Sequence, residues 1–518
     1  MGHAVALSRF ENLDVLLTRN ERYSRKPQTE KQKKKILFVT SEYSELVKVG
    51  GLGDVSSALP KALAPDYDIR VLIPGYPQII NSGVPLRIIG SVPAQGEIPA
   101  CRIALMNLPS GQIIYVLLCA ELYERMGTPY GDNHGQDWPD NPVRFARLGL
   151  AAAEIAADKA GLRWQPDLVH ANDWPAGLAP AFIRWRGQDT PTVFTIHNLA
   201  YQGLCNQEYC ESLKLPEEAL HIDGMEFYGK LSFLKAGLNY ADHITTVSKT
   251  YAWEITTPNF GCGLDGLLKQ KFERGQLSGI ANGIDEDWNP RTDHHLVKTF
   301  DPCYREGKAA NARYVEQMFG LRPSQGPLFA VVSRLVQQKG IDLTMAISES
   351  IVKAGGRLAI IGCGEPALEE ELVRLSERYP RDIGVHIGFN ETDARRMFAG
   401  SDFLLMPSRF EPCGLSQMYA QRFGSLPIAR HTGGLVDTIT DGVTGFLFHR
   451  AQPDTYWKAV QRAFNVFRSP DLLHAMRSKA MHAPLTWRES VQPYDQLYRS
   501  LIGEPVRQLV PSEGGLLA

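Results

Sequence analysis

A chain of 518 residues is too long for a single hydrophobic core of ordinary size, so we expect two large domains. With 44% hydrophobic and 22% charged residues, the composition is that of a folded globular protein and excludes extensive disorder. The formal net charge of −2 argues against nucleic acid or an acidic membrane as a partner, so an anionic ligand would need a local cluster of cations.

The eight cysteines are spread thinly, and no C-x-x-C pair occurs. This spacing predicts neither a zinc site nor a disulfide framework, and it favours reduced thiols in the cytoplasm. No apolar run approaches the ~20 residues that a membrane-spanning helix needs. Residues 1–34 are basic but also contain acidic side chains, which favours an extension outside the fold over a plastid-targeting peptide.

The first part of the chain predicts an α/β domain over 35–286. An apolar run at 35–40 is typical of a buried parallel strand, and a glycine loop at 48–54 and a helix over 55–64 follow it. Further strands are predicted at 69–74, 113–119, 168–170, 192–196 and 243–248, with helical stretches between them. This alternation predicts a doubly wound sheet.

Turn residues at 280–291 interrupt the pattern and predict a hinge. A second series of strands follows at 328–333, 357–362, 385–388, 403–407 and 426–430, so we expect a second doubly wound domain over 287–485 and a last helix near 494–502. Ligands of such sheets bind beyond the carboxyl ends of the strands, which makes the loops there the candidates for chemistry.

Two of these loops carry cations. Lys48, Gly50 and Gly51 precede a predicted helix, where backbone N–H groups and the lysine could contact a phosphate, although a tight turn explains the loop equally well. Arg334 and Lys339 follow the first strand of the second domain and could hold a diphosphate, whereas a solvated loop is the usual role of such a pair.

Two further loops of the second domain suit a sugar phosphate. Glu411 can accept hydrogen bonds from sugar hydroxyls, with N–H groups near Gly414 and Leu415 beside it. Cys413 in the same loop is interpreted as a small buried thiol because no partner histidine is visible. The loop at Thr432, Gly433 and Gly434 opens another helix, either as a phosphate contact or as an ordinary helix cap.

In the first domain, polar and aromatic residues end two predicted strands. Asp173 and His197 bring polar groups to the sheet edge, and Trp174 and Tyr130 offer flat faces for pyranose rings. The D-x-D spacings at 66–68 and 285–287 fall before a strand and in the hinge, so we interpret them as solvated and expect no metal.

Taken together, these motifs resemble those of bacterial glycogen synthases and plant starch synthases. The resemblance rests on K-x-G-G-L at 48–52 and on the segments 197–202, 282–285, 333–340, 408–415 and 432–435, in the family's order, and it covers the chain from residue 35 onward. It implies the GT-B fold, in which two Rossmann-like domains face a deep cleft, with segment 486–518 returning to the first domain. It also implies metal-independent, retaining transfer from ADP-glucose to the non-reducing end of an α-1,4-glucan, without a cofactor.

Carried over to this chain, the resemblance implies a role for each motif. The expected catalytic residues are Asp173, His197, Arg334, Lys339 and Glu411. The expected substrate-binding residues are Lys48, Gly50, Gly51, Tyr130, Trp174, Asn198, Asn282, Cys413, Gly414, Leu415, Thr432, Gly433 and Gly434. The chain departs from the E-x7-E pattern of the wider class at Tyr419, so no second carboxylate is expected there.

Three other functions stay open from the sequence. A related transferase would use UDP-glucose, as sucrose or trehalose synthases do. A nicotinamide dehydrogenase would share the sheets, but no G-x-G-x-x-G follows the first strand. A catalytically silent glucan-binding protein would bind glycogen without turnover. The oligomeric state is not predictable.

Overall fold

The computed structural model describes residues 32–303 and 306–505. The chain divides into the units Met1–Lys33 and Lys34–Ala518, and all helices and strands of the described ranges belong to the second unit. Most of the predicted extension at 1–34 and the end of the predicted segment 486–518 therefore lie outside the described residues.

The first sheet of this unit has nine strands within the described ranges. In spatial order they are β12 (Leu277–Gly279), β11 (His243–Thr246), β7 (Thr192–Ile196), β6 (Leu168–Asn172), β1 (Lys34–Val39), β2 (Tyr67–Pro74), β5 (Ile113–Leu118), β4 (Cys101–Asn107) and β3 (Arg87–Val92). The strands from β12 to β5 pair in parallel, as the alternation with helices predicts.

The far edge of this sheet is antiparallel, which the sequence did not predict. Strand β4 pairs antiparallel with both β3 and β5. A second addition is a small antiparallel sheet of β8 (Leu204–Asn206), β10 (Lys230–Ser232) and β9 (Glu226–Phe227). Strands β3, β8, β9 and β10 are largely exposed or only two or three residues long, so they lack the apolar pattern that marks a buried strand.

The second sheet is wholly parallel. Its order is β15 (Ile383–Ile387), β14 (Arg357–Gly362), β13 (Leu328–Val332), β16 (Phe403–Met406), β17 (Leu426–Arg430) and β18 (Phe446–Phe448). Alternate residues of β13 enter different cores: Phe329 and Val331 pack in one, and Leu328 and Ala330 in the other. Both faces are therefore buried, as the continuous apolar run of this strand requires.

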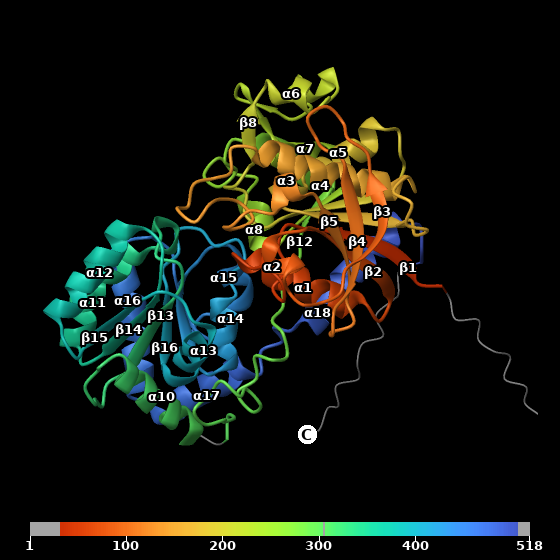
Figure 1. Cartoon of the computed structure of the whole chain (residues 1–518). Coiled ribbons are helices and arrows are strands. Elements are labelled where there is room, and N and C mark those ends of the chain that lie inside the picture. Colours follow the sequence, from red (N-terminus) through yellow and green to blue (C-terminus); the bar gives the residue numbers. More distant parts are fainter. Residues whose placement is uncertain (1–31, 304–305, 506–518) are drawn as a thin grey trace, which may run out of the picture. The chain divides into compact units, whose positions relative to one another are not determined.

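Helices cover the sheets and connect the strands (Figure 1). In the first half they are α1 (Gly51–Leu63), α2 (Pro77–Ile80), α3 (Ala120–Tyr123), α4 (Asn141–Ala156), α5 (Leu178–Trp185), α6 (Tyr209–Ser212), α7 (Phe233–Tyr240), α8 (Lys249–Glu254) and α9 (Asp265–Glu273). In the second half, which carries the second sheet, they are α10 (Glu306–Met318), α11 (Ile341–Lys353), α12 (Pro366–Arg378), α13 (Glu391–Gly400), α14 (Ser416–Arg422), α15 (Gly433–Thr438), α16 (Pro453–Phe467) and α17 (Pro470–Met481). The last helix is α18 (Trp487–Leu501). None of these helices has the length and apolarity that crossing a membrane would require.

The last helix, α18, packs on the first sheet rather than the second. Trp487, Tyr494 and Tyr498 belong to the core of the first half. The Tyr498 hydroxyl lies 2.6 Å from Nδ1 of His170, and the Tyr67 hydroxyl donates to Asp495 at 2.7 Å. The predicted fold class is thereby confirmed, including the return of the C-terminal helix. The boundaries at 286 and 485 stay predictions.

Candidate active site

The topology brings the predicted loops of each half together. In the first sheet β1, β6 and β7 are neighbours, and their carboxyl ends lead to the glycine loop, to Asp173 and to His197. In the second sheet β13, β16 and β17 are neighbours, and they lead to Lys339, to Glu411 and to the loop before α15. Each candidate group thus lies at a strand end beside the next one.

Glu42 organises the glycine loop, a role that the sequence analysis missed. This glutamate is 3% exposed, and its Oε2 accepts hydrogen bonds from the backbone N–H groups of Val49 at 2.7 Å and Gly50 at 2.9 Å. Its Oε1 accepts a hydrogen bond from the Tyr130 hydroxyl at 2.6 Å. The N–H group of Gly50, expected to contact a phosphate, is therefore used within the protein.

Lys48 also has a partner in its own loop. Its Nζ lies 2.7 Å from the Oδ1 of Asp54, on the first turn of α1. The lysine side chain is 40% exposed, so the pair is open to solvent and is a weak ion pair that a ligand can replace. Burial raises the pKa of Asp54, and Lys48 acts in the opposite direction.

Asp173 combines burial with an unusual backbone. Its φ of 57° and ψ of 178° fall in a backbone region that residues other than glycine rarely adopt. Strain of this kind is frequent at functional sites. Burial raises the pKa of its carboxyl group to about 8, and the facing N–H groups of Trp174, His197 and Asn198 only partly oppose this. The Oδ1 atom is buried and has no hydrogen-bond partner within the protein.

His197 is held as a neutral ring. Its Nε2 lies 3.1 Å from Oδ1 of Asn172, whose amide nitrogen donates to the backbone carbonyls of Val39 and His170. The amide oxygen is therefore the acceptor, which places the proton of His197 on Nε2. Burial lowers the pKa of His197 to about 3. The next residue, Asn198, accepts a hydrogen bond from the N–H of Ala200 through its Oδ1.

The two predicted aromatic faces lie against each other. Trp174 and Tyr130 have ring centroids 6.1 Å apart, and both pack on Phe145. A Cβ atom at Gly203 would lie 2.3 Å from the indole of Trp174, and Gly203 has a φ of 60°. Only glycine allows this close approach, so the loop after β7 and the ring of Trp174 fix each other.

In the second half, Lys339 and Glu411 form a buried pair. The Nζ of Lys339 lies 2.5 Å from Oε2 of Glu411, with side-chain exposures of 17% and 6%. The hydroxyl of Ser408 donates to the same carboxylate oxygen at 3.0 Å. The pair places one cation and one hydroxyl acceptor at adjoining strand ends, as a sugar phosphate requires.

Arg334 lies in the same loop as Lys339 but is exposed. Its guanidinium makes one long hydrogen bond, 3.4 Å to the Oε1 of Gln338. Arg409, by contrast, holds both oxygens of Asp342 at 2.8 and 2.7 Å and is committed to that pair. Arg334 therefore keeps donor groups available for a ligand.

Contacts between the two halves bring further candidates together. A Cβ atom on Gly51 would lie 3.8 Å from Cδ1 of Leu415, so the glycine loop lies beside the loop that begins α14. Burial raises the pKa of the Cys413 thiol to about 12, and the neighbouring Asn282 acts in the opposite direction. The interpretation of Cys413 as a buried, unreactive thiol fits this pKa. Gly414 has a φ of 69° in the same loop.

The loop before α15 is occupied by Glu254, at the end of α8. Oε1 of this buried glutamate accepts hydrogen bonds from the Thr432 hydroxyl at 2.9 Å and from the N–H of Gly433 at 3.1 Å. Thr432 does stand at the N-cap position of α15, as the alternative of an ordinary cap expects, but its side chain makes no hydrogen bond to that helix. The N–H of Gly434 donates to the carbonyl of Glu411. A phosphate would have to displace Glu254 to use Thr432 and Gly433.

A second carboxylate makes the reverse contact. Oδ2 of Asp437, on α15, accepts hydrogen bonds from the Ser248 hydroxyl and from the N–H groups of Lys249 and Thr250. These groups form the amino end of α8. Each helix therefore supplies a carboxylate to the amino end of the other, which stabilises both ends. We call Glu254 and Asp437 the α8–α15 clasp.

Comparisons with known proteins identify the family of this chain. A family model described as "Starch synthase catalytic domain" matches residues 35–270, and one described as "Glycosyl transferases group 1" matches residues 316–481. A glycogen synthase of Pseudomonas fluorescens is 64% identical over 92% of this chain and 91% of its own length. A glycogen synthase of Pseudomonas aeruginosa is 59% identical over 97% and 98%.

The chain belongs to the glycogen synthase family. It is therefore a glycosyltransferase, and its two doubly wound domains are those of the GT-B fold. The catalytic domain of starch synthase IV from Arabidopsis thaliana, solved with ADP and acarbose, superposes with a TM-score of 0.81 at 28% identity and covers 92% of this chain and 100% of that one. Sucrose-phosphate synthase from Thermosynechococcus elongatus, at 18% identity and a TM-score of 0.58, shares the fold.

The surroundings of Tyr419 explain why a tyrosine, and not a carboxylate, stands at this position. Its ring stacks on Trp288 with centroids 3.5 Å apart, and the guanidinium of Arg395 lies 3.9 Å from the Trp288 ring. Tyr419 thus packs at the connection between the halves, where a carboxylate would be buried beside apolar rings.

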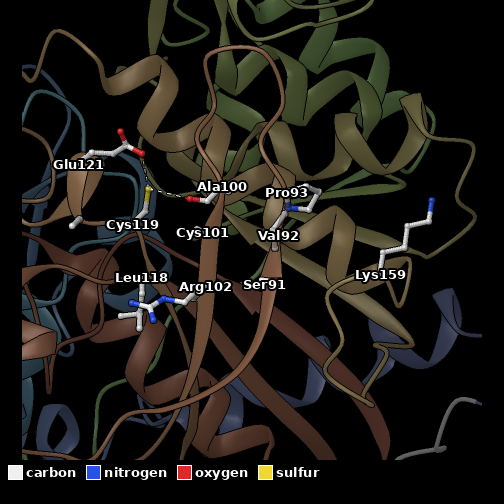
Figure 2. A pocket seen from close by; sticks show the side chains of 11 residues that line it. Ser91, Val92, Pro93, Ala100, Cys101, Arg102, Leu118, Cys119, Glu121 and Lys159 are labelled. Atoms are coloured by element: carbon white, nitrogen blue, oxygen red, sulfur yellow. Dashed lines mark hydrogen bonds between the residues drawn. The ribbon is translucent and has the colours of Figure 1, made fainter.

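One cavity of the described residues lies away from these loops. It has a volume of about 640 Å³ and is lined by residues of β3, β4 and β5 and of the segment that begins α3, among them Cys101, Arg102, Cys119 and Glu121 (Figure 2). None of the predicted site residues lines it, so it is not the transfer site. One group in the described residues has metal-ligand spacing, Asp293 with His294 and His295, but the carboxylate of Asp293 is paired with Arg395 at 2.9 Å.

Proposed function

We propose that this glycogen synthase family member transfers glucose from ADP-glucose to the non-reducing end of an α-1,4-glucan and releases ADP. The identity of 64% with a glycogen synthase over 92% of the chain carries the proposal. The retained pair of Lys339 and Glu411 at the strand ends supports it, because it supplies a cation for a diphosphate and an acceptor for glucose hydroxyls.

The chemistry follows from where charge develops. Breaking the bond between glucose and the diphosphate leaves negative charge on the leaving group and an oxocarbenium-like centre on the sugar. Lys339 and Arg334 would stabilise the leaving diphosphate as fixed cations. Lys339 would leave Glu411 for the phosphate, and the freed carboxylate would accept hydrogen bonds from the donor glucose.

We further propose retention by attack of the acceptor hydroxyl on the face that the diphosphate leaves. The leaving phosphate would take the acceptor proton, so no protein nucleophile is needed. Among the candidate residues, Asp173 is the carboxyl group that could serve as a protein nucleophile. Burial raises its pKa to about 8, however, which makes it a poor nucleophile near neutral pH. Its unpartnered Oδ1 suits a hydrogen bond with a sugar hydroxyl instead.

The reaction is proposed to need no metal and no cofactor, since lysine and arginine supply the positive charge. The cytoplasm is proposed as the location, because all eight cysteines are free thiols. The oligomeric state is not part of the proposal.

A donor panel tests the function. The chain is incubated with glycogen and either ADP-glucose or UDP-glucose, and the released nucleoside diphosphate is measured with and without excess EDTA. We expect turnover with ADP-glucose that survives EDTA. Preference for UDP-glucose would contradict the donor, and loss of activity restored by Mg²⁺ would contradict the metal-free reaction. Retention of the chain on glycogen without turnover would favour a silent binding protein.

A further inference from the structure

The hairpin between β9 and β10 carries an aromatic side chain that the proposed reaction does not use. Tyr228 and Gly229 form its two-residue turn, and Phe227 pairs with Lys230 across it. Tyr228 is 82% exposed, more than any other large hydrophobic side chain among the described residues. Burial in the protein therefore does not account for the ring.

The turn itself disfavours tyrosine. The φ angles are 47° at Tyr228 and 78° at Gly229, both in the left-handed region, which is the pattern of a type I′ turn. Asparagine followed by glycine is the preferred sequence of such turns, and a bulky side chain at positive φ is strained. An exposed, strained aromatic residue points to a function outside the fold.

The ring of Tyr228 is held in place despite its exposure. It packs edge-on against Phe227, with centroids 4.8 Å apart. A Cβ atom at Gly263 would lie 3.2 Å from Cε2 of Tyr228 and 3.1 Å from Cζ of Phe227. One edge of the ring therefore rests against the loop at Gly263, while most of its surface stays open to a ligand.

Hydrogen bonds connect this hairpin to the loop after β7, which carries His197. Gln202, in that loop, donates from Nε2 to the carbonyl of Cys262, the residue before Gly263, at 3.1 Å. The Ser232 hydroxyl at the end of β10 donates to the carbonyl of Gln202 at 3.2 Å. Tyr228 thus belongs to a hairpin that is bonded to the loop carrying His197, although the ring itself contacts Phe227 and Gly263, which are not candidate site residues.

Exposed aromatic side chains gather on these connected segments. Five large aromatic side chains are exposed among the residues that the structure describes: Tyr201, Tyr228, Trp253, Phe272 and Phe389. Tyr201 precedes Gln202, and Trp253 belongs to α8, whose Tyr251 hydroxyl accepts a hydrogen bond from the N–H of Leu199 in the same loop. Three of the five therefore lie on the loop after β7 or on segments that are hydrogen bonded to it.

We propose that Tyr228 is a stacking platform for the acceptor glucan, under a glucose unit at least two places behind the one that reacts. The proposal rests on the proposed function, which makes a glucan the acceptor. A pyranose ring presents a flat face of C–H groups, and covering this face with an aromatic ring removes apolar surface from water. The tyrosine hydroxyl at the rim can also hydrogen bond with a sugar hydroxyl.

The variant Tyr228→Asn separates binding from folding. Asn-Gly is the favoured sequence for this turn, so the thermal midpoint should not fall. We expect the KM for glycogen to rise about threefold to tenfold, from the loss of one stacked face. The KM for ADP-glucose and the turnover with maltose, which is too short to reach the platform, should stay unchanged. Tyr228→Trp should keep the native KM, and Phe272→Ala serves as the control for loss of an exposed aromatic.

Two outcomes would overturn the platform: an unchanged KM for glycogen in Tyr228→Asn, or an equal loss with maltose, which would indicate a disturbed transfer site. Migration in native gels that contain glycogen supplies a test without turnover. The native chain should be retarded and Tyr228→Asn less so. If the native chain does not turn over ADP-glucose, the proposed function fails, whereas equal retardation of the two chains rejects the platform alone.

Discussion

At the scale of single residues, the candidate site is a set of polar groups that satisfy one another. Glu42 holds the N–H of Gly50, Asp54 pairs with Lys48, and Glu411 pairs with Lys339. Asp173 differs from these, since its buried Oδ1 has no partner. A substrate that binds to Gly50, Lys48 and Lys339 must therefore replace their present partners, and it can supply the hydrogen-bond partner that Asp173 lacks.

The raised pKa of Asp173 predicts a stability effect that depends on pH. Asp173→Asn should raise the thermal midpoint relative to the native chain, and the difference should grow from about pH 4 to pH 8 and then level off. The folded pKa of about 8 exceeds the unfolded value of ~3.9, so the stability that the protonated carboxyl group contributes is present in full below ~3.9, falls as the pH rises from there and is lost once the pH has passed 8. The asparagine stays neutral throughout. Thermal unfolding of both chains across this range measures the difference, and a constant difference would show that the carboxylate is paired.

Lys339 predicts an effect on catalysis. Lys339→Met should lower kcat/KM for ADP-glucose by ~10- to 150-fold, since a charge-assisted hydrogen bond contributes about 1.5–3 kcal/mol. The change also leaves Glu411 buried without its partner, which lowers stability. Lys339→Met/Glu411→Gln should recover the thermal midpoint but not the activity. Lys353→Ala, which removes a lysine from an exposed ion pair on α11, is the matched control. A near-native kcat/KM in Lys339→Met would show that the loop after β13 is not part of the site.

At the scale of elements, the α8–α15 clasp holds the loop before α15 in place. Gly433 has a φ of 45°, and a Cβ atom there would lie 1.9 Å from the carbonyl oxygen of Glu411. The loop is therefore packed against the Glu411 segment from one side and bonded to Glu254 from the other. This arrangement gives Thr432 and Gly433 a structural role before any ligand binds.

Glu254→Ala tests the clasp. It removes a buried acceptor from Thr432 and Gly433, which should cost about 1.5–3 kcal/mol and lower the thermal midpoint by at least ~3 °C. Glu254→Gln keeps a carbonyl acceptor and should lose less than half of that. Glu349→Ala, at an exposed position of α11, should leave the midpoint unchanged. Equal midpoints for Glu254→Ala and the native chain would mean that the clasp does not stabilise the halves.

The sequence predicted the elements that obey a local rule and missed those that depend on distant contacts. The strand at 192–196 was predicted with its observed bounds because it is a short run of β-branched and aromatic residues. Strands β3 and β9 were missed because they are exposed or only two residues long. Glu42 was missed because its hydroxyl partner lies 88 residues away, and Glu254 because its partners lie 178 and 179 residues away. Motifs identified the loops but not the carboxylates that hold them.

At the scale of the whole molecule, the two crossings between the halves lie together. The N–H of Ile284 donates to the carbonyl of Leu485 at 2.9 Å, and Ile284 forms a bridge with Thr486. A Cβ atom at Gly283 would lie 2.3 Å from the nitrogen of Trp487. The outgoing and returning segments are thus paired at one place, which suits a pivot between rigid halves.

This pivot predicts that the halves close around the substrates. Lys48 and Asp173 belong to one half and Lys339 and Glu411 to the other, so a donor that contacts both sets draws them together. Closure would also exclude water, which competes with the glucan for the activated glucose. We expect the radius of gyration in solution scattering to fall when saturating ADP and a maltooligosaccharide are added together. Lys339→Met should show a smaller fall, because its grip on the diphosphate is lost. If the native chain turns over normally while its scattering stays unchanged at saturation, the site is preformed and the pairing at Ile284 only joins the halves.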